Sequence, residues 1–266
     1  MTFIPFQIIA VFTNNEISFN GNPAACVFLD SPLDKTKMQP IAKELNLPAT
    51  SFIWKEEGEE AFKIRWFAPD EEIGLCGHGS AAAAVFLGTR FDTHQPIRLR
   101  YNSGEIIVIW KEDETFSIKL DPIPLGKEIE VPEAILKGLG IPIIAMYETD
   151  NKHLILTDRE SSVRKMQPDF ERLRESEIFG YTVTAQGDKV DFVSRTLVPH
   201  VLQLEDHATG SSHAILVPFW AKRFDKDNMQ SLQFSPRGGA FVCGMKDGKV
   251  ILSGEYEILN QGNVSV

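Results

Sequence analysis

The sequence of 266 residues predicts a mixed α/β protein of the α+β class, built from two similar halves. Three observations support this prediction. Many short segments rich in β-branched and aromatic residues alternate with a few helical patterns, a proline-rich stretch divides the chain near its middle, and the order of elements before this stretch recurs after it. A chain of this length can bury a sizeable core as one large domain or as two of roughly 130 residues.

The first half, residues 1–123, is predicted to contain two helices and several strands. Residues 34–45 have helical spacing, because Met38 and Ile41 fall on one face together with two further apolar residues. A run of alanines predicts a second, apolar helix at 80–87. Strands are expected at 6–12, 24–29, 51–55, 62–67, 97–101, 105–110 and 116–120. The third and fourth of these strands form a hairpin around an acidic turn.

The proline-rich stretch at 121–126 (DPIPLG) is the expected boundary, so the second half covers 124–266. Helices are expected at 131–139, 161–174 and 210–222, and strands at 143–146, 153–156, 180–184 and 191–196. From residue 233 onward the pattern predicts strands around a turn at Asp247 and Gly248.

Composition and charge exclude several classes of function. Lys and Arg number 27 and Asp and Glu number 37, so the formal net charge is −10. An acidic chain repels phosphate backbones, and nucleic acid is therefore not an expected partner. No run of about 18 apolar residues predicts a membrane span, and residues 1–6 lack the basic character of a secretory signal. Three widely spaced cysteines form no disulfide framework or CxxC pair, which predicts a reducing compartment, the cytoplasm.

A short motif recurs at the start of one helix in each half. Residues 76–81 (CGHGSA) open the apolar helix of the first half, and residues 207–212 (HATGSS) open the corresponding helix of the second half. This alignment pairs Cys76 with His207 and His78 with Thr209. The repeat, together with the matching order of strands and helices, predicts two similar halves.

Both motifs predict a site for an anion. A helix N-terminus presents unpaired N–H groups and the positive end of the helix dipole. The backbone can approach a ligand closely at three glycines, Gly77, Gly79 and Gly210. Two halves packed face to face would bring both helix starts to one cleft, which suits a small carboxylate or the enolate that forms next to it. In the alternative interpretation these are ordinary glycine-containing loops with serine caps.

Other interpretations of the first motif have less support. Gly77, Gly79 and Ala82 match the loose dinucleotide pattern G-x-G-x-x-A, but no buried strand precedes them and no acidic residue follows about 20 positions later. The helix dipole favours a thiolate at Cys76, so a reactive cysteine is one interpretation and a buried structural cysteine is the other. The histidines form no metal-ligand pattern, so a metal is not expected.

Six segments together resemble a known family. They are 11–13 (VFT), 19–25 (FNGNPAA), 41–46 (IAKELN), 64–69 (IRWFAP), 75–79 (LCGHG) and 205–211 (EDHATGS). In this order, and spread over nearly the whole chain, they resemble the phenazine-biosynthesis isomerase-like family (PhzF-like proteins), which shares its fold with diaminopimelate epimerase. The combination is specific, although each segment is common by itself.

The resemblance implies a diaminopimelate epimerase-like fold of two similar halves. Each half would be a curled, mostly antiparallel sheet around one central helix, with these helices starting near Ser80 and Ser211. The chain end would cross back to complete the first half. The resemblance also implies a homodimer and an active site between the halves that uses no cofactor or metal.

The resemblance also implies a set of site residues. Glu44 falls on the acid/base of the family's A-x-E-x-N segment, His78 on the histidine of its G-H motif, and Asp206 on the aspartate of its D-x-x-T-G-S motif. By spacing alone, Glu44 would be a surface carboxylate and Asp206 an N-terminal charge for the next helix. Substrate-binding positions are implied for Gly77, Gly210 and Ser211, which would hold a carboxylate, and for Asn22 in the G-N-P turn.

The implied function is a cofactor-independent isomerase of a small carboxylic acid. A carboxylate in a closed, desolvated cleft has a raised pKa and can accept and return a proton. Glu44 would therefore move a hydrogen between carbons of an unsaturated acid. His78 and Asp206 would hold the substrate's hydroxyl or amino group.

Two alternatives remain open. The related epimerases use two opposed cysteines, whereas here Cys76 stands opposite His207, which replaces the family's usual proline. An epimerase or racemase of an amino-acid-like substrate could use this unequal pair. The other alternative is a module that binds a small ligand or a partner protein without turnover.

Overall fold

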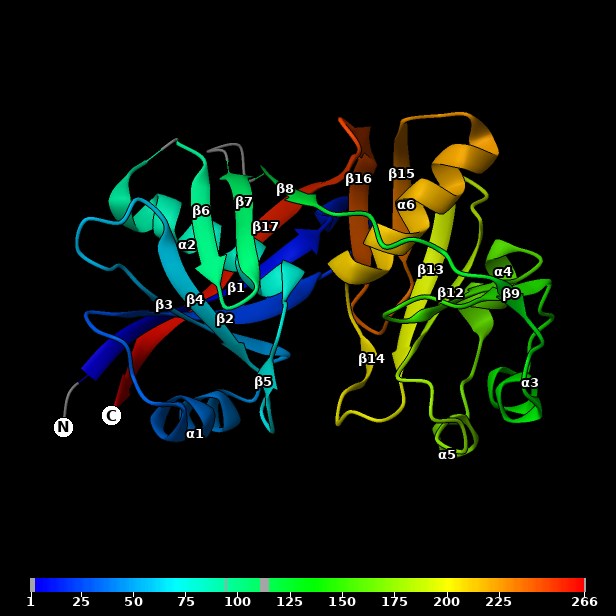
Figure 1. Ribbon diagram of the computed structural model, residues 1–266, viewed down its shortest axis with the longest axis horizontal. Coiled ribbons are helices and arrows are strands. Elements are labelled where there is room, and N and C mark those ends of the chain that lie inside the picture. Colours follow the sequence, from blue (N-terminus) through cyan, green and yellow to red (C-terminus); the bar gives the residue numbers. More distant parts are fainter. Residues whose placement is uncertain (1–2, 94, 111–114, 266) are drawn as a thin grey trace. The chain divides into compact units, whose positions relative to one another are not determined.

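The computed structural model describes residues 3–93, 95–110 and 115–265. The chain divides into two compact units (Figure 1). Unit 1 comprises residues 1–119 and 253–266, and unit 2 comprises residues 120–252. Each unit combines a mixed sheet with helices, so the expected α+β class is confirmed.

The strands of unit 1 form one continuous ladder. They are β1 (Phe3–Thr13), β2 (Asn22–Leu29), β3 (Ala49–Trp54), β4 (Phe62–Phe67), β5 (Glu72–Ile73), β6 (Ile97–Tyr101), β7 (Gly104–Trp110), β8 (Thr115–Leu120) and β17 (Lys249–Ser265). From β17 through β1 to β8, neighbouring pairs are antiparallel except β2 with β3 and β4 with β6, which are parallel. The expected hairpin is confirmed, because β3 and β4 pair from Thr50↔Phe67 to Trp54↔Lys63.

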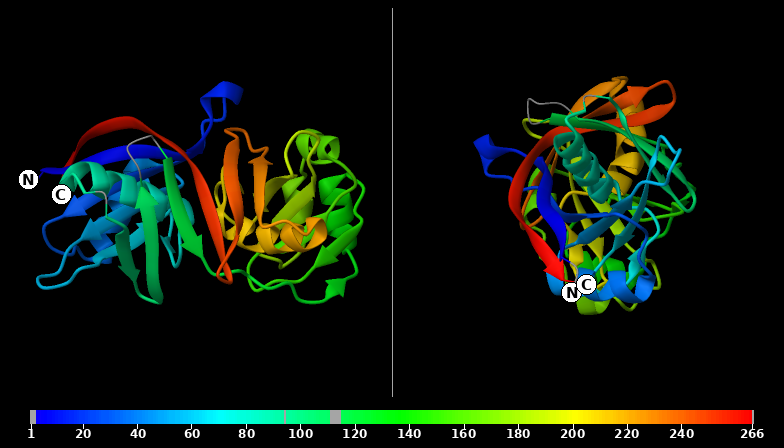
Figure 2. Two further views of the ribbon diagram at one scale, coloured as in Figure 1. Left: turned by 90° about the horizontal axis from the view of Figure 1, so that it is seen from above. Right: turned by 90° about the vertical axis from the view of Figure 1, so that its left-hand side faces the viewer.

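The ladder of unit 1 closes on itself around one helix. β17 runs antiparallel beside β1, as the red and blue strands of Figure 2 show, and it also pairs with β8. The hydroxyls of Ser117 and Ser253 lie 2.6 Å apart at this seam. Inside lies α2 (Gly77–Phe91), which is buried at every residue from His78 to Gly88. A helix that is apolar on all sides needs such an enclosure, because it has no face to give to water.

Glycine within α2 permits the tight fit to the sheet. A Cβ at Gly88 would lie 2.0 Å from Nε1 of Trp110. Any other residue at this position would therefore clash with the indole ring that packs against the helix. The indole N–H donates to the carbonyl of Thr93 at 2.8 Å. The curled sheet around a central helix, expected from the resemblance, is therefore confirmed for unit 1.

Helix α1 (Lys35–Leu45) covers the outer face of the sheet. Asp34 caps it by accepting the N–H of Thr36 at 2.8 Å. Its buried face presents Met38, Ile41 and Ala42, which pack with apolar residues of β2, β3 and β4. Burying each large side chain of this kind stabilises the unit by roughly 1.5–3 kcal/mol.

Unit 2 repeats the same order of elements. Its strands are β9 (Glu128–Ile129), β10 (Ala145–Tyr147), β11 (His153–Leu156), β12 (Tyr181–Gln186), β13 (Phe192–Val198), β14 (Leu204–Asp206), β15 (Asn228–Gln233) and β16 (Gly239–Lys246). Its parallel pairs, β11 with β12 and β13 with β15, correspond to the two parallel pairs of unit 1. The central helix is α6 (Gly210–Phe224), which is largely buried. The prediction of two similar halves is therefore confirmed.

The helix expected at 161–174 is wrong as one element. The structure has two short helices there, α4 (Glu160–Lys165) and α5 (Phe170–Leu173). The helix expected at 131–139 is confirmed as α3 (Glu133–Leu139). Pro168 separates α4 and α5, because proline disfavours helical backbone at the preceding residue and lacks an N–H. The helix expected at 80–87 is longer than predicted and extends over Gly77–Phe91.

Several short strands were not expected. β5, β9 and β14 have two or three residues each, which is too short for a periodic pattern. The predicted turn is confirmed, since Asp247 and Gly248 have φ of 51° and 71° between β16 and β17. Such positive φ values suit a two-residue hairpin turn.

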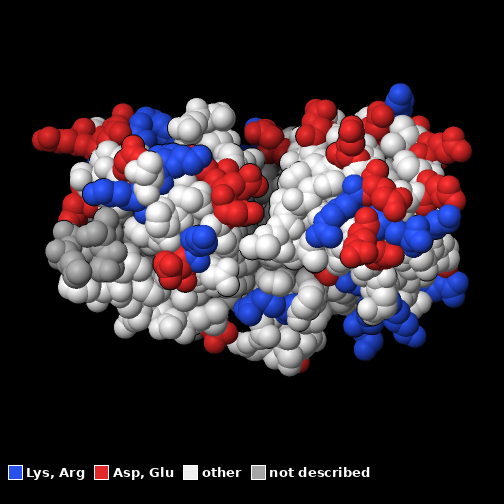
Figure 3. All heavy atoms as spheres, turned by 90° about the horizontal axis from the view of Figure 1, so that it is seen from below, with Lys and Arg blue, Asp and Glu red and all other residues white. Residues whose placement is uncertain are grey.

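Charges of both signs are interspersed on the face of each unit that Figure 3 shows. The excess of acidic residues therefore forms no single-sign field across that face of the described residues. Among the described helices, none has the length and apolar character needed to cross a membrane.

Candidate active site

The central helices of the two units start and end alike. α2 and α6 both have 15 residues, and both end at an aspartate in the left-handed conformation, Asp92 and Asp225. Their N-caps, Cys76 and Thr209, both have extended backbone. When the N-caps and C-caps of α2 and α6 are matched, Cys76 therefore aligns with Thr209.

This alignment corrects the one that the motif predicted. His207 is not the counterpart of Cys76, because it precedes its N-cap by two residues, where unit 1 has Gly74. His78 is likewise the counterpart of Ser211 and not of Thr209. The motif comparison matched small residues, which align in more than one register, whereas the helix caps determine the register. A hydroxyl, and not an imidazole, occupies the position equivalent to the Cys76 thiol.

Two candidate residues meet in the first turn of α2. Cys76 Sγ lies 3.5 Å from Nδ1 of His78, and both side chains are buried. The hydroxyl of Ser80 donates to the carbonyl of Cys76 at 2.7 Å and closes the turn. Cys26 lies nearby on β2, and burial together with the charge of Cys76 raises the pKa of its thiol. Three titratable side chains, those of Cys26, Cys76 and His78, are therefore buried near this end of α2.

Gly79 packs against the sheet. A Cβ at this position would lie 2.9 Å from Cδ1 of Trp66, 3.0 Å from Sγ of Cys76 and 3.1 Å from Oγ of Ser51. Ser51 and Trp66 are cross-strand partners on β3 and β4, and Ser51 donates to the carbonyl of Gly79 at 3.0 Å. This glycine therefore allows the first turn of α2 to rest directly on the two strands.

Glu44 and Asn22 lie at the same end of the sheet as this turn. The parallel register Ala24↔Ala49 places the start of β2, with the buried Asn22, beside the start of β3. Glu44 lies in the last turn of α1, shortly before β3, and its side chain is exposed. The structure therefore places Glu44 in a solvated position, unlike the desolvated environment expected for it.

In unit 2 a compact network holds Asp206 at the start of α6. The hydroxyl of Thr209 donates to Oδ2 of Asp206 at 2.7 Å. Gln233 on β15 donates through Nε2 to the Asp206 carbonyl at 2.6 Å and to the Thr209 hydroxyl at 3.0 Å. Its Oε1 accepts the N–H of Thr209 at 2.9 Å. Gln233 is fully buried, so these bonds fix the turn from Asp206 to Thr209.

A buried lysine lies beside Ser211 in the first turn of α6. Lys152 is 6% exposed, and its Nζ donates to Oγ of Ser211 at 2.9 Å and to Oδ1 of Asn151 at 2.6 Å. An ammonium group only donates hydrogen bonds, so the Ser211 oxygen accepts and its own proton remains available for an acceptor. A positive charge, a hydroxyl donor and the N-terminus of α6 together favour an anion at Gly210 and Ser211.

His213 supports the same turn from inside. Its Nδ1 lies 2.9 Å from the Thr209 carbonyl and its Nε2 lies 2.9 Å from the Ser231 hydroxyl. A carbonyl only accepts, so Nδ1 carries the proton and Nε2 accepts from Ser231. Full burial lowers the pKa of His213 to about 4. The imidazole is therefore neutral and serves to hold the N-cap of α6.

His207 lies in the loop before α6. Burial lowers its pKa, against the opposing effect of the adjacent Asp206. Its backbone carbonyl accepts the Ser235 hydroxyl at 2.7 Å. Within residues 3–93, 95–110 and 115–265, no three His, Cys, Asp or Glu side chains are grouped as a metal ion would require.

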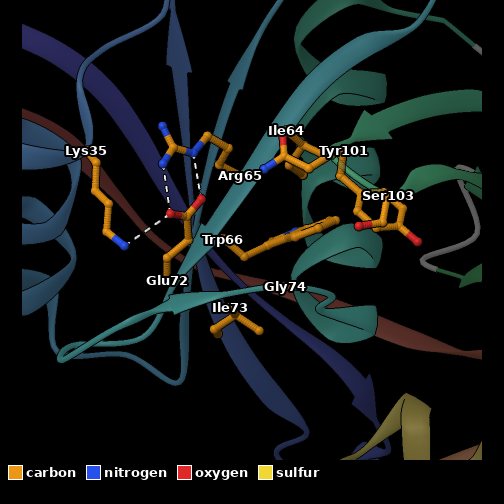
Figure 4. A pocket seen from close by; sticks show the side chains of 10 residues that line it. Lys35, Ile64, Arg65, Trp66, Glu72, Ile73, Gly74, Tyr101 and Ser103 are labelled. Carbon is orange, nitrogen blue, oxygen red and sulfur yellow. Dashed lines mark hydrogen bonds and ion pairs between the residues drawn. The ribbon is translucent and has the colours of Figure 1, made fainter.

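A separate pocket of about 270 Å³ lies in unit 1, beside β4 and β5 (Figure 4). Arg65 and Glu72 line it with Trp66 and Tyr101, whose ring centroids are 5.3 Å apart. Hydrogen bonds from Arg65 hold the pKa of Glu72 below its usual range. The lining includes none of the expected catalytic residues.

The fold places the chain in a known structural class. It superimposes on a solved probable proline racemase from Agrobacterium radiobacter K84 with a TM-score of 0.69, at 11% identity, over 99% of this chain and 93% of that one. At this identity the likeness concerns the fold alone. The chain thus has the architecture of the racemase and epimerase proteins.

Comparison with related sequences identifies the family within this structural class. Residues 9–240 match the family described as phenazine biosynthesis-like protein (PhzC-PhzF). An uncharacterized isomerase of Pseudomonas aeruginosa is 36% identical over 92% of this chain and 93% of its own length. A solved PhzF-family protein from Enterococcus faecalis is 35% identical, with full coverage of both chains and a TM-score of 0.91. The chain belongs to this family and is an enzyme of the isomerase type.

Sequence reasoning missed three supporting residues of these turns, Ser51, Lys152 and Gln233. Each lies on or beside a strand far from the helix start that it contacts. Lys152 precedes a strand by one residue, and Gln233 ends one, so no periodic pattern distinguishes them. Only the pairing of distant segments reveals their roles.

Proposed function

We propose that this protein is a cofactor-independent isomerase that moves a proton on a small carboxylic acid. The observation that carries this proposal is the family membership of a chain in which Glu44, His78 and Asp206 are all present. His78 lies in the first turn of α2, and Asp206 ends β14 three residues before the N-cap of α6. Such helix starts suit a substrate that is an anion.

Glu44 is the proposed acid/base. Its carboxylate removes a proton from a carbon near the substrate carboxylate, and the electron pair spreads into the adjacent double bond. Protonated Glu44 then returns the proton to a different carbon, so one C–H bond is broken, another is formed at the second carbon, and the double bond shifts between them. The reaction involves no net oxidation and needs no further reactant. Because the Glu44 side chain is exposed, the bound substrate has to shield its carboxylate from water.

The proposed carboxylate site is the first turn of α6. Backbone N–H groups at Gly210 and Ser211 face an anion there, and the Ser211 hydroxyl has a proton to donate. Lys152 adds a positive charge 2.9 Å from this hydroxyl. Charge-assisted bonds of this kind are roughly twice as strong as neutral ones, so they favour an acid over its neutral analogue. Gly77 and Asn22 are proposed to contribute to substrate binding from unit 1.

The test is proton exchange in D₂O, followed by NMR. Candidate substrates are small unsaturated acids such as 3-butenoate, hydroxy- and amino-substituted acids, and the amino acid L-proline. We expect the wild-type protein to incorporate deuterium into its substrate and Glu44→Gln to lose this activity. The control is Glu16→Gln, which changes an exposed carboxylate of the same unit. Full activity in Glu44→Gln would refute Glu44 as the shuttle.

A second candidate is an epimerase that uses Cys76. The observation favouring it is the 3.5 Å separation of the Cys76 thiol and His78 Nδ1, which provides a thiol with an adjacent base. The notion that His207 completes a pair with Cys76 loses support, because the helix caps align Thr209 with Cys76. Loss of exchange in Cys76→Ala, with Glu44→Gln active, would favour the epimerase.

A further inference from the structure

An arginine–glutamate pair holds the strand that leads into α2. Arg65 on β4 donates from Nε to Oε1 of Glu72 at 2.7 Å and from Nη2 to Oε2 at 2.8 Å. Figure 4 shows both bonds, with Lys35 approaching the same carboxylate at 3.3 Å. The ladder partner of Glu72 is Phe67, so Arg65 reaches the carboxylate diagonally across the two strands.

Unit 2 has the same pair before α6. Arg195 on β13 donates from Nε to Oε1 of Glu205 and from Nη2 to Oε2, both at 2.7 Å. The ladder partner of Glu205 is Leu197, so the diagonal offset is the same as in unit 1. Arg195 also donates from Nη1 to the carbonyl of Met166. Both charged side chains are largely buried.

The position of the pair relative to the helix is also repeated. Glu72 lies four residues before the N-cap Cys76, and Glu205 lies four residues before the N-cap Thr209. The loops between the paired strands differ in length, since residues 68–71 form one and 199–203 form the other. The pair is therefore preserved where the connecting loop is not.

The short strands explain why such a pair is needed. β5 has two residues and β14 has three, so their ladders supply few backbone hydrogen bonds. A bidentate arginine–carboxylate pair adds two parallel bonds with a defined direction. It anchors the chain four residues before the point at which each central helix begins.

We propose that these two pairs, Arg65–Glu72 and Arg195–Glu205, are positioning residues that hold the two helix-start turns in their active geometry. We call them the helix-start clamps. Unit 1's clamp fixes the turn at 73–79, which contains Cys76 and His78. Unit 2's clamp fixes the turn at 206–212. The catalytic consequence rests on the proposed function, whereas the positioning itself does not.

The first experiment measures backbone amide hydrogen exchange in the intact protein without substrate. In Arg65→Gln we expect exchange at 73–79 to accelerate about tenfold or more, because two charge-assisted bonds are lost. Strands β2 and β3 should keep their protection. Arg195→Lys should accelerate exchange at 206–212 alone, since lysine keeps the charge but not the fork.

The matched control is Arg98→Gln. Arg98 on β6 donates from Nε to Glu105 on β7 at 2.9 Å in the same unit, but this pair does not lie immediately before either central helix. Its removal should leave exchange at 73–79 unchanged. Uniform acceleration across unit 1 in Arg65→Gln, or none at 73–79, would overturn the proposal, because the pair would then contribute only general stability or nothing.

A second readout is the reactivity of Cys76. Cys76 is 5% exposed, so iodoacetamide should modify its thiol slowly in the native protein. Arg65→Gln should raise this rate about tenfold, while the buried thiols of Cys26 and Cys243 remain protected. The charge-swapped double variant Arg65→Glu with Glu72→Arg should restore slow modification. Equal acceleration at all three cysteines would refute local positioning.

The catalytic consequence has a separate measurement. For an acid into which the wild-type enzyme exchanges deuterium, Arg65→Gln should lower kcat more than it changes KM. The reason is that a displaced turn affects the chemical step more than substrate binding. An effect on KM alone would overturn the catalytic part. If no acid is exchanged by the wild-type protein, the proposed function fails, and hydrogen exchange and Cys76 modification still decide whether the clamps position the turns.

Discussion

Thr209 Oγ1 and Asp206 Oδ2 are joined by a 2.7 Å hydrogen bond at the entry to α6. Thr209 is the N-cap of this helix, yet its side chain does not cap the helix backbone. The hydroxyl instead donates to the Asp206 carboxylate, while the side-chain oxygen of Gln233 accepts the N–H of Thr209. The orientation of the proposed catalytic aspartate is therefore coupled to the start of the central helix.

Removing this hydroxyl should impair the reaction. Thr209→Val keeps the shape of the side chain but removes its hydrogen bond to Asp206. We expect a loss of turnover in the D₂O exchange assay together with a loss of about 1–3 kcal/mol in the free energy of unfolding. Thr209→Ser retains a hydroxyl and should retain most activity. Full turnover in Thr209→Val would contradict the role given to this bond.

Lys152 should determine the preference for an acid. Lys152→Met is expected to weaken binding of 3-butenoate by about 10- to 100-fold, because a charge-assisted contact is lost. Titration followed by NMR measures the dissociation constant, and 3-butenamide is the uncharged ligand control. Lys165→Met, at an exposed position of the same unit, should have no effect. Equal affinity of Lys152→Met and wild type for the acid would exclude this role.

His213 should make the stability depend on pH. Its pKa is about 4 in the folded protein, below the value of 6.5 for an unperturbed histidine. Between these values the unfolded state binds a proton that the folded state does not, so stability falls as the pH is lowered from 6.5 towards 4. The full effect is about 3 kcal/mol.

Urea unfolding between pH 7 and pH 5 measures this dependence. His213→Gln should be less stable at pH 7, because it loses the contacts with Thr209 and Ser231, but its stability should fall less steeply on acidification. The exposed His200 provides the control, and His200→Gln should retain the wild-type slope. An unchanged slope in His213→Gln would show that other groups cause the acid sensitivity.

Gly79 should tolerate no side chain. In Gly79→Ala the new methyl group would contact the Trp66 ring at 2.9 Å, which forces the ring or the helix start to move. We expect a loss of about 1–3 kcal/mol in the free energy of unfolding. Gly74→Ala is the matched control, because no atom lies within 4 Å of its added Cβ. Equal stability of the two variants would contradict the packing described here.

Elements with strong local signals could be predicted from the sequence. The strand at Ile97–Tyr101 and the start of α6 at Gly210 occur where the hydrophobic pattern placed them. Pro168 divided an expected helix, although its effect on the preceding residue is itself a local rule. The shortest strands escaped prediction because two or three residues show no period.

The candidate site likewise could be predicted only in part from the sequence. Spacing alone gave no reason to select Glu44 or Asp206, and only a resemblance spread over six segments did so. The repeat of the helix starts was visible in the sequence, but the alignment of Cys76 with His207 was wrong by two residues. Short motifs of small residues align in more than one register, whereas a cap is defined by backbone geometry.

The sequence by itself determined the class of fold, the two similar halves and the family, because periodicity and ordered motifs are properties of the chain. Tertiary structure alone decided that Thr209 corresponds to Cys76, that Lys152 lies beside Ser211, and that Arg65 and Arg195 clamp equivalent strands. The hydrogen bonds among these relationships join residues between 7 and 59 positions apart. Such contacts depend on sheet register and packing, which are cooperative properties of the folded chain.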